Sequence, residues 1–226
     1  MYDKLFGKEW YEILKDYLYS EEFKNIGLEV SKQYESEKVL PPKGSPLYFK
    51  IFKDLQPSKI KVIILGMDPY PQEGIYTGYA FDNANSTKLS PSLRNIFKEI
   101  ERTYPENKEE LILDGWDLKR WVVQGVFLIN TALTVIENSP GSHLALWRPF
   151  TIEWIKRLSE YRNDLIWLLW GSKAHDFSQY INNPSHYIIK TGHPSPLNRS
   201  NPFIGSNCFV EANEQLKGLN KTEILW

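Results

Sequence analysis

The chain has 226 residues, of which 42% are apolar and 24% are charged, and 27 Lys+Arg against 28 Asp+Glu leave a formal net charge of −1. This length and composition are typical of one well-packed domain and exclude an intrinsically disordered chain. Because the net charge is close to zero, a polyanionic partner would have to bind a local basic patch.

The cysteine content and the short apolar runs limit the class of protein. Cys208 is the only cysteine, so it cannot form an internal disulfide, and no Cys/His cluster has the spacing of a zinc site. We therefore expect a reducing compartment, the cytoplasm or, for a eukaryotic or viral protein, the nucleus. The longest apolar runs, 62–65 and 165–170, are far below the roughly 20 residues of a membrane span. We expect a soluble protein with no membrane partner and no metal.

The first quarter of the chain is predicted to be helical. Residues 8–36 carry apolar side chains at helical spacing, as in Trp10, Leu14 and Leu18, and predict two helices. Pro41, Pro42 and Gly44 then interrupt the helical pattern, and 47–55 is typical of a short helix.

From residue 61 on, β-branched runs alternate with helical stretches, which is typical of parallel strands joined by crossover helices. The strands are predicted at 62–67, 126–133, 165–170 and 187–191, each apolar enough to be covered on both faces. Helices are predicted near 92–103, 114–122, 148–162, 172–180 and 207–217. This pattern predicts one domain over residues 1–226 in the α/β class, a three-layer α/β/α sandwich with a central four-stranded parallel sheet.

Each predicted strand ends in a loop rich in Gly, Pro and polar residues, at 66–71, 130–131, 171–172 and 192–197. Open parallel sheets bind their ligands at the carboxyl ends of the strands, so these loops are expected to meet in one cleft. Asp68, Asn130 and His193 would bring a carboxylate, an amide and an imidazole into that cleft. Taken singly, Asp68 is also typical of a turn before a proline, and His193 of an ordinary hydrogen-bonded histidine.

Other residues near the cleft allow two interpretations each. Phe81 is either a core ring or a ring that stacks on a planar ligand, since it lies between Gly78 and Asn83 in an expected loop. Ser90-Pro91-Ser92 is either a helix cap or a phosphate site, and Gly171-Ser172, followed by Lys173, has the same two interpretations.

Seven segments in the same order resemble the family 1 uracil-DNA glycosylases over the whole chain. They are Val39-Leu40-Pro41-Pro42, Gly66-Met67-Asp68-Pro69-Tyr70, Gly78-Tyr79-Ala80-Phe81, Pro91-Ser92-Leu93-Arg94-Asn95, Leu128-Ile129-Asn130-Thr131, Leu169-Trp170-Gly171-Ser172 and His193-Pro194-Ser195-Pro196-Leu197. The resemblance implies excision of uracil from DNA by hydrolysis of its N-glycosidic bond, with base flipping and without a cofactor.

The resemblance also implies a role for each matching residue. Asp68 would activate water and stabilise the cationic sugar, and His193 would donate a hydrogen bond to uracil O2. The base would be bound by the Met67 backbone, the Asn130 amide, the Phe81 ring and Tyr70, which would exclude the methyl group of thymine. DNA would be bound by Ser92, Gly171, Ser172, Ser195 and Leu197, with Leu197 filling the gap left in the duplex.

Two residues depart from the pattern of the family and leave alternatives open. Met67 and Pro71 stand where the family usually has glutamine and histidine. A smaller departure is the segment Asn198-Arg199-Ser200-Asn201, which moves the basic residue of the loop after Leu197. The alternatives are a DNA-binding or replication-accessory protein with weakened catalysis, and a glycosylase with a shifted base preference such as hypoxanthine. The expected partner is DNA, single- or double-stranded, with a protein inhibitor or a replication protein as a further partner, and the expected state is a monomer.

Overall fold

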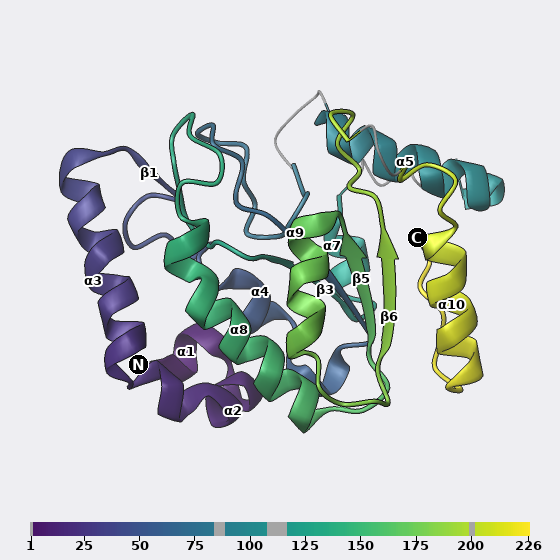
Figure 1. Cartoon of the computed structure of the whole chain (residues 1–226), viewed down its shortest axis with the longest axis horizontal. Coiled ribbons are helices and arrows are strands. Elements are labelled where there is room, and N and C mark those ends of the chain that lie inside the picture. The colour runs from purple at the N-terminus through teal and green to yellow at the C-terminus, as the bar shows by residue number, and fades with distance from the viewer. Residues whose placement is uncertain (1, 84–88, 108–116, 199–201) are drawn as a thin grey trace.

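A four-stranded parallel sheet in the order β3-β2-β5-β6 forms the centre of the molecule (Figure 1). The computed structural model describes residues 2–83, 89–107, 117–198 and 202–226. The strands are β2 (Val62–Gly66), β3 (Val126–Asn130), β5 (Ile166–Trp170) and β6 (Tyr187–Thr191). In the register of β2 and β3, Gly66 lies beside Asn130, so the two strands end level with each other. The four predicted strands and their parallel direction are confirmed, but the strands predicted at 62–67 and 126–133 end earlier, at Gly66 and Asn130.

Helices cover both faces of the sheet, which confirms the three-layer sandwich (Figure 1). Trp154 stacks on Trp167 of β5 on one face, with ring centroids 6.2 Å apart, and Phe209 contacts Trp170 of the same strand on the other face. The helices of the first face are α2 (Lys8–Leu18), α4 (Lys50–Asp54) and α8 (Leu144–Tyr161), and those of the second are α5 (Pro91–Thr103), α7 (Lys119–Val122) and α10 (Cys208–Gly218).

The amino-terminal helices agree with the helical spacing of 8–36. The segment forms α2 and α3 (Glu21–Ser36), and the Ser20 hydroxyl caps α3 by accepting a hydrogen bond from the Phe23 N–H at 3.2 Å. A further short helix, α1 (Tyr2–Phe6), precedes them and buries Phe6. The predicted helix at 47–55 is α4, and it is followed by a 3₁₀ helix, η1 (Pro57–Lys59).

Besides these strand ends, the strand predictions differ from the structure at two places. A two-stranded antiparallel sheet of β1 (Val39–Leu40) and β4 (Val135–Ile136) was not predicted, because two residues are too few to show a period. The expectation that every strand is covered on both faces is wrong for β6, which lies at the edge of the sheet and exposes Tyr187 and Ile188. Its apolar sequence therefore overstated its burial.

The helix predictions differ mainly in their boundaries. Helix α8 begins at Leu144, four residues before the predicted start, and contains Pro149. The additional turn contains Trp147, whose side chain is buried and whose indole N–H donates to the Thr134 hydroxyl. The segment predicted at 172–180 is α9 (Ser172–His175) followed by the 3₁₀ helix η3 (Asp176–Tyr180). Of the helix predicted at 114–122, residues 114–116 lie outside the described residues and 119–122 form α7. Another 3₁₀ helix, η2 (Pro105–Asn107), follows α5.

One cluster of buried apolar side chains extends from Phe6 to Trp226 and includes all four strands of the sheet. The prediction of one domain over the whole chain stays a prediction. Cys208 lies within the cluster, fully buried, and burial raises the pKa of its thiol to about 12. Within the described ranges, no helix is long and apolar enough to cross a membrane.

Candidate active site

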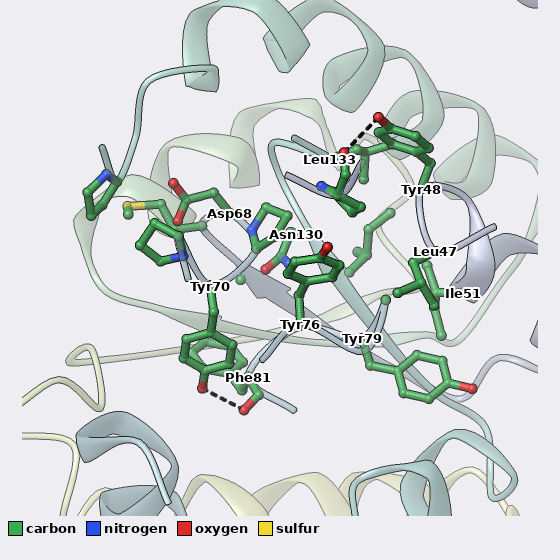
Figure 2. A pocket seen from close by; sticks show the side chains of 18 of the residues that line it. Leu47, Tyr48, Ile51, Asp68, Tyr70, Tyr76, Tyr79, Phe81, Asn130 and Leu133 are labelled. Atoms are coloured by element: carbon green, nitrogen blue, oxygen red, sulfur yellow. Dashed lines mark hydrogen bonds between the residues drawn. The ribbon is translucent and has the colours of Figure 1, made fainter. Parts of the chain in front are cut away.

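The ends of the central strands open into a cavity of about 250 Å³ (Figure 2). Its wall combines residues from loops that are far apart in the sequence. The predicted site residues that line it are Met67, Asp68, Tyr70, Phe81, Ser92, Asn130 and His193. The structure therefore brings together the carboxylate, the amide and the imidazole singled out from the sequence.

Asp68 lies just beyond the end of β2 and is held by the loop between β4 and α8. Its Oδ2 accepts a hydrogen bond from the Gly141 N–H at 2.5 Å. The same loop is tied to the Asp68 segment again by the Asn138 N–H, which donates to the Pro71 carbonyl at 2.8 Å. Burial raises the pKa of the Asp68 carboxyl, while the Gly141 hydrogen bond and the charge of Lys173 act in the opposite direction. The site therefore holds a carboxylate that is only partly compensated.

Asn130 is the last residue of β3, and its amide lies against the backbone of the neighbouring strand. A Cβ at Gly66 would lie 2.2 Å from the Asn130 Oδ1, so only glycine leaves room for the amide there. The next residue, Thr131, is bonded to the chain at the end of β2. Its N–H donates to the Gly66 carbonyl and its hydroxyl donates to the Met67 carbonyl, both at 2.9 Å. The direction of the Asn130 amide is therefore set by backbone contacts.

Phe81 and Tyr70 form an aromatic side of the cavity (Figure 2). Phe81 has a φ of +65°, a conformation that costs about 1–2 kcal/mol for a residue with a Cβ and is concentrated at functional sites. The Tyr70 hydroxyl donates to the Phe81 carbonyl at 2.9 Å and lies 2.8 Å from the Ser90 hydroxyl, which caps α5. The Phe81 ring also lies 5.3 Å from that of Trp170, so the ring is held on several sides.

His193 follows β6 and has a defined tautomer. Its Nδ1 accepts a hydrogen bond from the Ser195 N–H at 3.0 Å, so the proton of the neutral imidazole is on Nε2. Burial lowers the pKa of this histidine, and the charge of Lys173 lowers it further. A Cβ at Gly171, whose φ is +86°, would lie 2.8 Å from the His193 Cβ. The imidazole is therefore a neutral donor packed against a glycine.

A second cavity of about 480 Å³ adjoins the first and shares Gly66, Met67 and His193 with it. Most of the residues singled out for DNA binding lie in its wall: Gly171, Ser172, Ser195 and Leu197. The Leu197 side chain is 88% exposed, although leucine is usually buried. Of the predicted DNA-binding residues, only Ser92 lies in the first cavity instead.

Two residues of the loop beside Asp68 could not be recognised from the sequence as parts of the site. Gly141 carries the hydrogen bond to the carboxylate, and His143, two residues on, is fully buried between the Thr134 hydroxyl (2.6 Å) and the Gln33 amide oxygen (2.5 Å). The turn-forming sequence Ser139-Pro140-Gly141-Ser142 was a usable signal for a tight loop there, but nothing in it indicated that the loop reaches Asp68. Within the described ranges, no group of three or more His, Cys, Asp or Glu side chains could hold a metal ion.

Comparisons with known proteins give a consistent result. The profile of the Uracil DNA glycosylase superfamily matches residues 52–217. The uracil-DNA glycosylase of Borreliella burgdorferi (strain ZS7) is 41% identical over 220 residues, which cover 96% of each chain, and that of Fusobacterium nucleatum is 37% identical over 221 residues, 97% of this chain and 95% of the relative. The crystal structure of mimivirus uracil-DNA glycosylase superposes with a TM-score of 0.83 at 29% identity, covering 98% of this chain and 87% of that chain.

Proposed function

This chain belongs to the uracil DNA glycosylase superfamily and excises uracil from DNA in base excision repair, and we propose that it does so as a family 1 enzyme through Asp68, Asn130 and His193. The observation that carries the proposal is that these three side chains, from the ends of three different strands, line one cavity. The reaction is hydrolysis of the N-glycosidic bond, which separates a base from its deoxyribose.

Asp68 and His193 stabilise the two charges that this bond cleavage creates. As the bond lengthens, positive charge develops on the sugar and negative charge on the departing base. The Asp68 carboxylate, positioned by the Gly141 N–H, stabilises the sugar cation and orients the attacking water. The His193 Nε2–H donates to uracil O2; because its pKa is lowered, the imidazole stays neutral near pH 7 and donates without carrying a charge.

The remaining cavity residues select the base. The Asn130 amide pairs with the edge of uracil, and cytosine, with its donors and acceptors exchanged, leaves that amide mismatched. The Phe81 ring stacks on the face of the base, and Tyr70 stands against C5, where thymine carries its methyl group. Met67 contributes its backbone N–H toward the base.

The second cavity receives the DNA strand. A base in a duplex cannot reach His193 unless its nucleotide leaves the stack, at a cost of a few kcal/mol. Ser92, Ser172 and Ser195, with the backbone at Gly171, bind phosphates and offset that cost, and the exposed Leu197 side chain fills the gap in the duplex. We propose that the protein acts as a monomer in the compartment that holds the DNA, cytoplasm or nucleus.

A protein inhibitor is a further expected partner. A substituted mimivirus UNG has been solved in complex with UGI, and it superposes on this chain with a TM-score of 0.84 at 29% identity. By analogy, UGI added at equimolar concentration should abolish uracil release by this protein. Undiminished release under excess UGI would remove this partner from the proposal.

The test of the residue roles is a strand-cleavage assay. An oligonucleotide with one uracil is incubated with the protein and then with alkali, which breaks the strand at an abasic site. The wild-type protein should cleave at the uracil, and Asn130→Ala and His193→Ala should each reduce the single-turnover rate by roughly 10²-fold or more. Single variants that retain the wild-type rate would contradict the assignment of these residues.

A further inference from the structure

Lys173 lines the second cavity, beside a residue that this cavity shares with the first. It belongs to α9, in the loop region that follows β5, and its Nζ is 3.7 Å from the Met67 Sδ. Met67 lines both cavities and directly precedes Asp68. The lysine side chain therefore spans from the wall of the second cavity to the residue next to the candidate catalytic carboxylate.

The contact with Met67 leaves the ammonium free to change partners. A thioether is a weak acceptor, so it does not bind an ammonium firmly. No shorter polar contact of the Lys173 Nζ is found within the described ranges. The four-carbon stem of a lysine is flexible, so rotation of its bonds can turn the ammonium toward a group that enters the second cavity.

The charges around Lys173 are few. The charged side chains in the wall of the second cavity are Lys173, Arg148 and Asp176, and the Arg148 guanidinium is engaged over the Phe177 ring at 4.9 Å. Asp68 accepts the Gly141 N–H from the 138–141 loop, and it shares the wall of the first cavity with Tyr70 and His193. Among these groups Lys173 is the cation whose field acts on both Asp68 and His193.

We propose that Lys173 is a positioning residue with two partners: its ammonium compensates the Asp68 carboxylate in the free protein and binds a backbone phosphate when DNA enters the second cavity. This rests on the proposed function, because it takes Asp68 as the carboxylate of the reaction. When the phosphate engages the ammonium, the carboxylate loses its compensating charge and acts more strongly on the sugar cation. DNA binding and the electrostatics of the reaction are thereby coupled through one side chain.

The experiment compares Lys173→Met with the wild type in two measurements. In the first, kcat/KM for a uracil oligonucleotide is followed against pH, since this ratio reports the groups of the free protein. Loss of the cation raises the pKa of both Asp68 and His193. The acid limb of the kcat/KM profile should therefore move to higher pH. In the second, binding to an oligonucleotide with an uncleavable tetrahydrofuran site is followed against salt. The slope of the logarithm of the binding constant against the logarithm of the salt concentration should become less steep by about one.

Two control variants separate charge from structure. Lys173→Arg keeps the charge and should keep both the acid limb and the salt slope. Lys24→Met removes a lysine that is paired with Glu21 in the first turn of α3, away from both cavities, and should change neither measurement. An unchanged salt slope in Lys173→Met would overturn the phosphate contact, and an unchanged acid limb of the kcat/KM profile would overturn the charge compensation of Asp68.

Failure of the proposed function would have a different signature. If Asp68→Asn cleaves at the wild-type rate, Asp68 is not the carboxylate of the reaction, whatever Lys173 does. If Asp68→Asn is inactive while Lys173→Met matches the wild type in both measurements, the proposed function stands and the role of Lys173 is rejected.

Discussion

Asp68 is held in a position that costs stability. Because burial raises its pKa above the ordinary 3.8, the native protein takes up a proton here more readily than the unfolded chain does. Stability attributable to this group is therefore lost as pH rises through the folded-state pKa, and the ionised carboxylate penalises the fold at neutral pH. Such a group is retained for the reaction it performs.

The first prediction follows for Asp68→Asn. The rate of uracil excision should fall by roughly 10² to 10⁴-fold, while the melting temperature at neutral pH should rise, because the amide oxygen still accepts the Gly141 N–H without a buried charge. Calorimetry against pH measures the second effect, and the gain should shrink as the pH approaches 3.8. A lower melting temperature for the variant at neutral pH would contradict this account.

The second prediction concerns Gly66. In Gly66→Ala the new Cβ would meet the Asn130 Oδ1 at 2.2 Å and the Ala80 Cβ at 2.7 Å, so the amide must turn away. Excision should fall steeply, and free uracil should inhibit the variant less than the wild type. The matched control is Gly27→Ala in α3, where nothing lies within 4 Å of the added Cβ and where stability should rise by about 0.5–1 kcal/mol. Normal uracil inhibition in Gly66→Ala would show that Asn130 tolerates the methyl group.

At this scale the sequence identified the side chains that face the cavity but not those that position them. Asp68, Asn130 and His193 could be found because polar residues after apolar strands are unusual and parallel strands end at one edge. Gly141 and the Gly66 contact could not, since both depend on how close two distant backbone segments approach.

At the scale of elements, α5 connects the first cavity to the loop that follows β6. Its cap, Ser90, touches Tyr70; the Asn95 amide donates to the Pro194 carbonyl at 2.8 Å; and Glu99, fully buried, accepts from the Gly205 and Asn207 N–H groups at 2.7 and 2.8 Å. The helix therefore holds the His193 loop and the backbone at Gly205 and Asn207 in one arrangement.

The third prediction is for Glu99→Gln. Burial alone would raise the pKa of Glu99, but the hydrogen bonds from Arg102, Gly205 and Asn207 outweigh it and lower the pKa below 4.5. The ionised Glu99 carboxylate therefore stabilises the fold above pH 4.5, and this stabilisation is lost as the pH falls through the folded-state pKa of Glu99. The variant should lose about 1–3 kcal/mol of unfolding free energy at neutral pH, with a smaller difference in acid and a raised KM for DNA. Denaturant titration at neutral and at acid pH checks this. The control is Glu214→Gln, a substitution of an exposed glutamate.

The strands and most helices could be predicted because their apolar periods are long enough to detect. The pair β1 and β4 could not, since two residues carry no period, and the start of α8 was misplaced because Pro149 is usually a first-turn residue. The upstream turn exists because Trp147 packs into the core and bonds to Thr134, a tertiary contact that local sequence does not show.

At the scale of the whole molecule, most of the aromatic packing lies on the middle of the sheet, while the site lies beyond the carboxyl ends of its strands. Aromatic rings from both outer layers pack on the middle of the strands, and Trp154 alone contacts Trp10, Phe52, Phe127 and Trp167. The two cavities lie beyond the carboxyl ends of the same strands. The residues of the site therefore leave the apolar pattern of the strands uninterrupted. This is why the class of fold could be predicted from the sequence.

The fourth prediction uses that separation. Trp154→Ala should cost about 3–5 kcal/mol of unfolding free energy and leave kcat of the folded fraction unchanged. Trp154→Phe should cost clearly less, because the indole N–H has no hydrogen-bond partner within the described ranges and only ring area is lost. Denaturation and activity are measured on the same samples, and a large fall in kcat for Trp154→Ala under conditions where it is folded would show that core and site are coupled.

The burial of Cys208 makes the protein convenient for fluorescence work. Its thiol is the only one in the chain, is shielded by the core and has a pKa of about 12, so a maleimide reagent at neutral pH should leave it untouched. A cysteine introduced in place of a solvent-facing residue near the second cavity would then be the single labelling point. A dye attached there would report the arrival and departure of a strand in real time, with no need to remove the native thiol first.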